Sequence, residues 1–241
     1  MITKDLLNED LSLKLDSEVA CMGIQDTLRY LSNRFQGEIV FSTSFGQEDQ
    51  IISDMIFTPD LPILVFTLDT GRHFEETYKV MNQTLSKYGK KIKVCFPDKD
   101  QVEKMMTQKG PFSFYESVDN RKECCHIRKV EPLEKILSQA SCWITGLRAA
   151  QSEARHELSQ FSYDAVNQVI KYNPLIKWSI EEVNDYLKKN HVPQNILHDR
   201  GFLSIGCAPC TRAVAEGEDL RSGRWWWEHN SSKECGLHQN D

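Results

Sequence analysis

Residues Ile39–Asp49 read IVFSTSFGQED, and this stretch decides the fold. Its first five residues are β-branched, aromatic or hydroxyl-bearing, which is typical of a short buried strand. The turn Ser44–Gly46 ends the strand, and apolar positions at helical spacing follow from Glu48 to Phe57. A strand, a tight turn and a helix in this order predict the first unit of an α/β fold.

The same alternation continues along the chain. Ser179 stands three residues before Glu182, the spacing of a capping box at the start of a helix. Alternating strands and helices predict a mostly parallel sheet with helices on both faces. Further strands are expected at Ile63–Leu68, Lys91–Phe96, Cys142–Leu147 and Val169–Asn173, and helices at 11–34, Glu75–Tyr88, Gln101–Lys109 and Ser179–Asn190.

Charge and hydropathy narrow the class of protein. The 241-residue chain has a formal net charge of −6, which argues against a general nucleic-acid binder. Its N-terminus is polar and acidic, unlike a secretory signal, and no apolar run reaches the roughly 20 residues of a membrane span. We therefore expect a cytoplasmic protein with no membrane or nucleic-acid partner. The sequence carries no signal for its oligomeric state.

Two turns follow predicted strands, where ligands bind in α/β sheets. The segment Ser42–Asp49 combines hydroxyls, a glycine and helix N-terminal amides, which suit an anion. The segment Leu68–His73 could hold a ribose or an adenine edge. Each segment taken alone could equally be a plain connection from strand to helix.

Eight cysteines divide into two groups by their surroundings. Cys21, Cys95 and Cys142 lie in amphipathic or apolar stretches, where we expect small buried side chains. The other five lie in polar, turn-rich or basic stretches, where packing does not require a thiol. They are Cys124, Cys125, Cys207, Cys210 and Cys235.

The spacing of four of these cysteines indicates a metal centre. Cys207-Ala208-Pro209-Cys210 could be a redox dithiol, half a zinc site or part of an iron–sulfur site. Adjacent residues such as Cys124 and Cys125 rarely meet at one small zinc ion, because their side chains diverge. A cluster presents several irons, so adjacent cysteines at a helix start can each reach a different one. The spacing therefore favours iron–sulfur over zinc.

Positive charge is concentrated near both cysteine pairs, so an acidic chain can still bind an anion there. Arg128 could belong to such a site or to a solvated helix face. The basic residues are Arg121, Lys122, His126, Arg128 and Lys129 around the first pair, and Arg212, Arg221 and Arg224 after the second.

These motifs together resemble the assimilatory phosphosulfate reductases, in particular the adenosine 5′-phosphosulfate reductases. The resemblance covers nearly the whole chain beyond the first ~20 residues. The matching segments are SFGQED at Ser44–Asp49, LDTGR at Leu68–Arg72, CCHIRKVEPL at Cys124–Leu133, GLRAAQSEAR at Gly146–Arg155, CAPC at Cys207–Cys210 and RSGRWWWE to KECGLH at Arg221–His238.

The resemblance implies an adenine-nucleotide α-hydrolase-like fold in a single phosphosulfate reductase domain, residues 1–241. Residues 1–20 would be an N-terminal extension. A C-terminal cluster-binding segment would lead into a mobile catalytic tail from about residue 228 to 241. In related pyrophosphatases the first loop reads SGG, whereas Phe45 replaces one glycine here. This departure fits a loop that holds a phosphosulfate rather than a triphosphate.

The resemblance also implies the site. Cys124, Cys125, Cys207 and Cys210 would hold a [4Fe–4S] cluster, and Cys235 would be the nucleophile, with His238 close by in the chain. Thioredoxin or glutaredoxin would be the reductant, in a pathway of sulfate assimilation and cysteine biosynthesis. Substrate would be bound by Thr43, Ser44, Gly46, Asp49, Leu68, Asp69, Lys129, Gly146, Arg148, Arg221 and Arg224.

Other functions stay open. The substrate could be the 3′-phosphorylated nucleotide, or both nucleotides could be accepted. A nucleotide-activating enzyme of the pyrophosphatase type would be expected to have the SGG loop, which this sequence lacks. A zinc-binding interaction module would use the four cysteines structurally, but it predicts a basic surface and gives no reason for the KECGLH segment.

Overall fold

A computed structural model of the chain describes residues 4–151, 155, 157–215, 217–219 and 221–228. The chain divides into two compact units. The first comprises Met1–Thr67, Glu76–Lys93 and Leu137–Asn195, and the second comprises Leu68–Glu75, Val94–Ile136 and Ile196–Asp241.

A six-stranded sheet runs in the order β3-β2-β1-β4-β6-β5. The pairs β1–β2, β1–β4 and β4–β6 are parallel, and only the β5–β6 pair among those with a stated register is antiparallel. The strands are β1 (Ile39–Ser42), β2 (Leu64–Leu68), β3 (Lys93–Cys95), β4 (Cys142–Ile144), β5 (Phe161–Asp164) and β6 (Val169–Tyr172).

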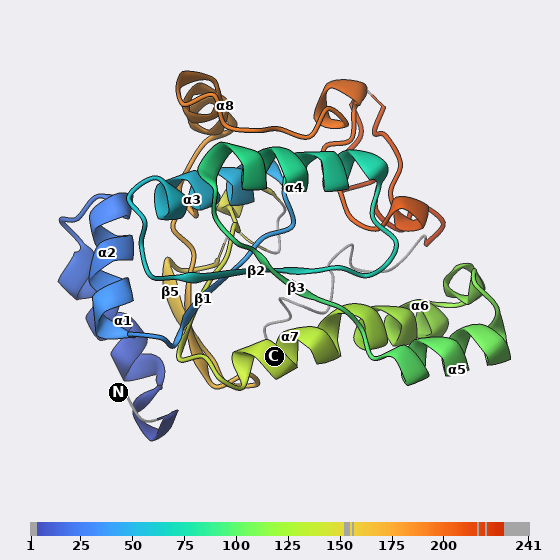
Figure 1. The fold of residues 1–241 in the computed structure, drawn as a ribbon, viewed down its shortest axis with the longest axis horizontal. Helices are drawn as coiled ribbons and strands as arrows, with labels where there is room; N and C mark the ends of the chain where they lie inside the picture. Colours follow the sequence, from blue (N-terminus) through green and yellow to red (C-terminus); the bar gives the residue numbers. More distant parts are fainter. Residues whose placement is uncertain (1–3, 152–154, 156, 216, 220, 229–241) are drawn as a thin grey trace. The chain divides into compact units, whose positions relative to one another are not determined.

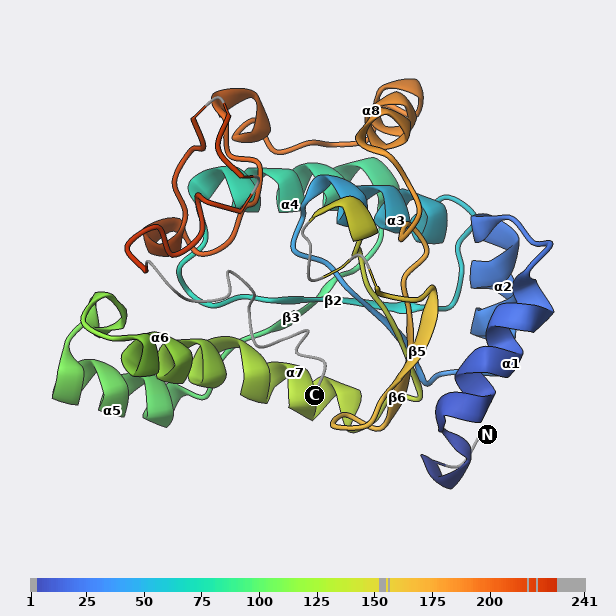
Figure 2. The same ribbon diagram turned by 180° about the vertical axis from the view of Figure 1, so that it is seen from behind.

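Helices of the first unit flank its strands. Figures 1 and 2 show α3 and α4 on the same side of β2, with α8 beyond them, and α1 beside β5. The mostly parallel sheet with flanking helices confirms the predicted α/β class. The helices are α1 (Glu9–Val19), α2 (Ile24–Arg34), α3 (Gln47–Phe57), α4 (Glu75–Tyr88) and α8 (Ile180–Lys189).

Apolar side chains between strands and helices form the core of the first unit. Phe41, Ile144 and Tyr172 stand next to one another across β1, β4 and β6, and all three are fully buried. Leu15 and Val19 of α1 belong to the same core, so part of the predicted N-terminal extension is packed. The predicted capping box is also present, since Ser179 and Glu182 exchange hydrogen bonds at the start of α8.

Several local predictions were wrong. The helical stretch 11–34 is two helices, because Gly23 adopts extended backbone and begins α2. Cys21, expected in the core, lies exposed in the turn between them. The fourth strand ends at Ile144 rather than Leu147, and β5 was not predicted, because its sequence FSYD is short and half polar.

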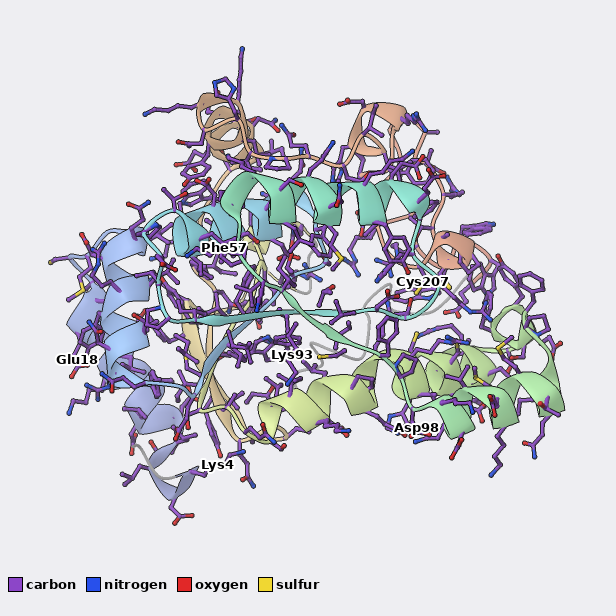
Figure 3. The ribbon with its side chains drawn as sticks, in the orientation of Figure 1. Lys4, Glu18, Phe57, Lys93, Asp98 and Cys207 are labelled. Atoms are coloured by element: carbon purple, nitrogen blue, oxygen red, sulfur yellow. The ribbon has the colours of Figure 1, made fainter. Side chains whose placement is uncertain are left out.

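The second unit contains α5 (Lys99–Lys109), α6 (Val118–Cys125) and most of α7 (Glu131–Leu137). Figure 3 labels Asp98 at the start of α5, where its side chain accepts a hydrogen bond from the N–H of Gln101 at 3.0 Å. Between α6 and α7 the segment His126–Val130 is a π-helix, a feature common at functional sites. Cys124 and Cys125 therefore end α6, which corrects their predicted place at a helix start.

Shorter helical turns complete the described chain: η1 (Lys4–Leu6), η2 (Ser113–Tyr115), η4 (Ala149–Gln151), η6 (His198–Arg200) and η7 (Ala208–Cys210). Among the described residues, no helix is long and apolar enough to cross a membrane.

Candidate active site

The loop between β1 and α3 is built around Asp49. The carboxylate oxygen Oδ2 of Asp49 accepts hydrogen bonds from the backbone N–H and the hydroxyl of Ser44, both at 2.6 Å. Thr43 Oγ1 accepts from the N–H of Phe45 at 3.1 Å. Phe45 has φ +62°, a left-handed backbone that glycine adopts more easily, and its side chain is buried. The loop is therefore a tight turn stabilised by its own polar side chains.

Asp49 and Gly146 lie against each other in the first unit. A Cβ at position 146 would collide with Asp49 Oδ1, so only glycine leaves room for the carboxylate. Burial raises the pKa of Asp49 to about 6, and the two hydrogen bonds from Ser44 oppose that rise. The pKa of this buried carboxyl group therefore lies above that of an ordinary aspartate.

Arg148, two residues after Gly146, is buried. Its Nε donates to Glu48 Oε1 at 2.7 Å, and its Nη1 donates to the carbonyl of Trp178 at 3.2 Å. Glu48 stands in the first turn of α3, next to Asp49. The predicted residues Thr43, Ser44, Gly46, Asp49, Gly146 and Arg148 are thus gathered at the carboxyl ends of β1 and β4 in the first unit.

The segment Leu68–Arg72 belongs to the second unit. The backbone N–H of Asp69 donates to the carbonyl of Cys95 at 2.9 Å, and Asp69 Oδ1 accepts from the N–H of Gly71 at 2.8 Å. Thr70 Oγ1 lies 3.3 Å from Cys207 Sγ. The turn after β2 therefore contacts the CxxC segment through Thr70 and Cys207.

Four cysteines of the second unit line one pocket. Cys124 and Cys125 come from the end of α6, and Cys207 and Cys210 from the η7 turn. Figure 3 labels Cys207 at the start of that turn. Three of the four side chains are buried and Cys125 is half-buried. Two cysteine pairs that are about eighty residues apart in sequence therefore meet in the fold.

Basic side chains surround this pocket. They come from the segment after β2, from α6 and the π-helix, and from the C-terminal segment. Arg128 Nη1 donates to the carbonyl of Thr70 at 2.6 Å and the side chain is buried, so it does not belong to a solvated helix face. The basic residues of the pocket are Arg72, Arg121, Arg128, Lys129 and Arg224.

Two thiols of the pocket, those of Cys124 and Cys210, have a raised pKa. Burial raises the pKa of Cys124, and the guanidinium of Arg128 opposes that rise. Burial, followed by the neighbouring Cys207, raises the pKa of Cys210 to about 12. A metal that binds thiolates would displace these protons.

The donor set of the pocket fits an iron–sulfur cluster. Within the described residues, no group of three His, Cys, Asp or Glu side chains could hold one metal ion. That finding concerns a single ion, whereas a cubane cluster binds each of four thiolates through a different iron. Four thiols and five basic side chains in one pocket suit a cluster, because the positive charge offsets that of the thiolates.

Four other predicted substrate residues belong to the second unit: Leu68, Lys129, Arg221 and Arg224. Lys129 and Arg224 line the pocket. Arg224 Nη1 donates to Ser204 Oγ at 3.5 Å, and Arg221 is buried three residues before it. The carbonyl of Leu68, the last residue of β2, lies 3.1 Å from the ring nitrogen Nε2 of His73. Cys235 and His238 lie outside the described residues.

Several residues of this site were not predicted from sequence. Thr70 and Arg72 stand inside the quoted LDTGR motif, and that motif was the signal that could have found them. Arg121 was noted only as one of several basic residues, and Glu228, its partner, was not singled out. Because an ion pair between positions 107 residues apart leaves no local pattern, neither spacing nor composition indicates it.

Comparisons with known proteins agree with this arrangement. A family model described as "Phosphoadenosine phosphosulfate reductase domain" matches residues 38–213. A curated protein from Allochromatium vinosum, named adenosine 5′-phosphosulfate reductase, is 47% identical over 203 residues, which are 84% of this chain and 79% of that protein.

Solved structures are similar as well. The phosphoadenylyl-sulfate reductase from Candida auris, a phosphate complex, matches with a TM-score of 0.73 and 26% identity over 86% of this chain and 98% of that one. The NH3-dependent NAD synthetase from Campylobacter jejuni matches with a TM-score of 0.50 and 10% identity over 78% of this chain and 76% of that one, and shows the fold alone. These likenesses confirm the predicted adenine-nucleotide α-hydrolase-like fold.

Proposed function

This chain belongs to the phosphoadenosine phosphosulfate reductase domain family, a family of reductases, and we propose that it reduces adenosine 5′-phosphosulfate to sulfite and AMP. The observation that carries the proposal is the pocket of four cysteines walled by basic residues. The relatives named adenosine 5′-phosphosulfate reductase, such as the Allochromatium vinosum protein, support this choice of substrate.

We assign substrate binding to two groups of residues. Thr43, Ser44 and Gly46 form the turn that leads into the start of α3, where the helix dipole favours an anion. Guanidinium groups match phosphate and sulfate oxygens with two parallel hydrogen bonds. The assigned charged and backbone residues are Asp49, Leu68, Asp69, Lys129, Gly146, Arg148, Arg221 and Arg224.

Two thiol reactions account for the chemistry. The Cys235 thiolate attacks the sulfur of the phosphosulfate, a sulfur–sulfur bond forms, the bond from sulfur to the phosphate oxygen breaks, and AMP leaves. A thiolate of a dithiol protein then attacks Cys235 Sγ and releases sulfite. The second thiol of that protein displaces Cys235, so the dithiol is oxidised to a disulfide and supplies the two electrons. His238, three residues after Cys235, is assigned to favour the thiolate.

We propose that Cys124, Cys125, Cys207 and Cys210 hold a [4Fe–4S] cluster. When bound, this group would keep the four sulfurs in place and supply the iron charge that balances them. Lys129 and Arg224 line the same pocket, where their positive charges can bind an anion. Cys235, which has no part in the cluster, is left to react.

The reductant is assigned to a separate dithiol protein, thioredoxin or glutaredoxin. The chain contains no second CxxC segment that could act as an internal dithiol. Such reductants keep thiols reduced in the cytoplasm, where we place the reaction, in the assimilation of sulfate toward cysteine.

A single-turnover experiment tests the function. Protein purified without oxygen is mixed with adenosine 5′-phosphosulfate and no reductant. We expect one AMP per chain and a gain of one SO₃ in the mass of the peptide that contains Cys235. Added thioredoxin should then release one sulfite. Cys235→Ser should bind AMP and form no adduct, with Cys21→Ser as the matched control that retains both steps. An adduct on another residue, or turnover by the Cys235→Ser variant, contradicts the mechanism.

A further inference from the structure

A buried ion pair joins the C-terminal segment to the helix that carries the first cysteine pair. Arg121 Nε donates to Glu228 Oε1 at 2.9 Å, and Arg121 Nη2 donates to Glu228 Oε2 at 2.8 Å. The exposed fractions of the two side chains are 6% and 4%. Two parallel hydrogen bonds fix the relative orientation of a guanidinium and a carboxylate, so this pair restricts both partners.

The position of the pair in the chain is the second observation. Arg121 lies three residues before Cys124, and Glu228 is the last described residue, seven residues before Cys235. Seven residues span at most about 25 Å when fully extended. Whatever fixes Glu228 therefore fixes the point from which Cys235 can reach a substrate.

The same segment is held by further contacts of the second unit. The Trp225 N–H donates to the carbonyl of Cys210 at 3.2 Å, and the Glu228 N–H donates to the carbonyl of Trp225 at 2.9 Å. The guanidinium carbons of Arg121 and Arg224 each lie 4.7 Å from the centre of a Trp225 ring. Trp225 has φ +42°, an unfavourable backbone for a bulky residue, which persists only where surrounding contacts hold it.

We infer that the Arg121–Glu228 pair is a positioning device: it fixes Glu228, the residue from which the chain continues toward Cys235, and so speeds the proposed attack of Cys235 on the substrate. The inference rests on the proposed role of Cys235. Neither residue needs to touch the substrate for this role.

A pair that only stabilises the fold makes a different prediction. Replacing a buried ion pair with apolar side chains of similar volume is often neutral or stabilising. The double variant Arg121→Met with Glu228→Leu should therefore keep or regain thermal stability. It cannot restore the two directed hydrogen bonds, so its Cys235 adduct should still form slowly.

The exposed Arg212–Glu218 pair supplies a matched control. It is also bidentate, although through the two terminal nitrogens of the guanidinium, with Nη1–Oε2 at 2.8 Å and Nη2–Oε1 at 2.9 Å, and it lies in the same C-terminal segment. Its side chains are 37% and 36% exposed, and Glu218 is ten residues before Glu228. Glu218→Gln removes one charge of a similar pair without touching the proposed anchor.

The experiment measures the rate of the Cys235 adduct in a single turnover without reductant, together with AMP affinity, iron content and melting temperature. For Glu228→Gln we expect at least a tenfold slower adduct, AMP affinity within twofold of the wild type and unchanged iron. The double variant should melt near the wild-type temperature and remain at least tenfold slow. Glu218→Gln should form the adduct at the wild-type rate.

Two results would overturn this inference and leave the proposed function standing. One is a wild-type adduct rate in Glu228→Gln. The other is a double variant that recovers both the wild-type adduct rate and the wild-type melting temperature. A wild-type protein that forms no adduct on Cys235 would instead refute the proposed function, and the anchoring role with it. The double variant keeps the test decisive if Glu228→Gln alone does not fold.

Discussion

The carboxylate of Asp49 lies directly against the backbone of Gly146, in the space that a Cβ at position 146 would fill. Asp49 lies at the start of α3 and Gly146 in the segment after β4, and Asp49 also accepts two hydrogen bonds from Ser44. The Asp49 side chain therefore packs the loop after β1 against the segment after β4.

Gly146→Ala should destabilise the protein. The added methyl group must displace a buried, hydrogen-bonded carboxylate, and overpacking of this kind costs about 1–3 kcal/mol. Urea denaturation measures the loss. Gly23→Ser is the matched control, because a Cβ at position 23 meets nothing within 4 Å and serine is a good residue at the start of a helix. Equal stability of the Gly146→Ala protein and the wild type would contradict the close fit.

Asp49→Asn should change how stability depends on pH. Burial raises the pKa of Asp49 to about 6 in the folded chain, above that of the unfolded chain. Its contribution to stability is therefore complete below about pH 4 and is lost as the pH rises through about 6. Asparagine does not titrate. The free energy of unfolding of Asp49→Asn, relative to the wild type, should rise by about 2 kcal/mol between pH 4.5 and 7.5.

Urea denaturation of both proteins at several pH values gives this difference directly. Serine is not a suitable replacement, because it would shorten the side chain as well as remove the charge. A difference that stays flat across this range would show that Asp49 titrates at its ordinary value in the folded chain, and one that falls with pH would contradict a raised pKa.

Protein purified without oxygen should be brown and contain about four irons and four inorganic sulfides per chain. Cys207→Ser should lose most of the iron, because it removes one of the four thiols of the pocket. Cys21→Ser should keep it, since Cys21 is exposed and belongs to the other unit. Iron and sulfide analysis, together with the visible absorption spectrum, tests this prediction. Stoichiometric zinc without sulfide would favour the zinc-binding module.

Turnover should be faster on adenosine 5′-phosphosulfate than on its 3′-phosphorylated analogue. The relatives at about 45% identity carry the name of the unphosphorylated substrate, whereas the Candida auris structure, at 26% identity, is of an enzyme for the phosphorylated one. Comparison of kcat/KM for the two nucleotides under the same reductant tests this. A higher value for the 3′-phosphorylated nucleotide would reassign the substrate.

Local sequence was sufficient where short-range patterns control structure. The helix predicted at Glu75–Tyr88 has those bounds in the structure, and the capping box at Ser179 starts α8 as expected. Such features depend on side-chain periodicity and on hydrogen bonds between residues three or four apart. The short edge strand β5 was missed because only its antiparallel pairing with β6 makes it a strand.

The sequence by itself determined the α/β class, the family motifs and the two cysteine pairs, because each is written in neighbouring residues. Only the tertiary structure brought Cys124 and Cys125 to the same pocket as Cys207 and Cys210, and set Asp49 against Gly146. It also paired Arg121 with Glu228. These contacts join residues some eighty to more than one hundred positions apart, and packing and burial decide them rather than any local preference of the chain.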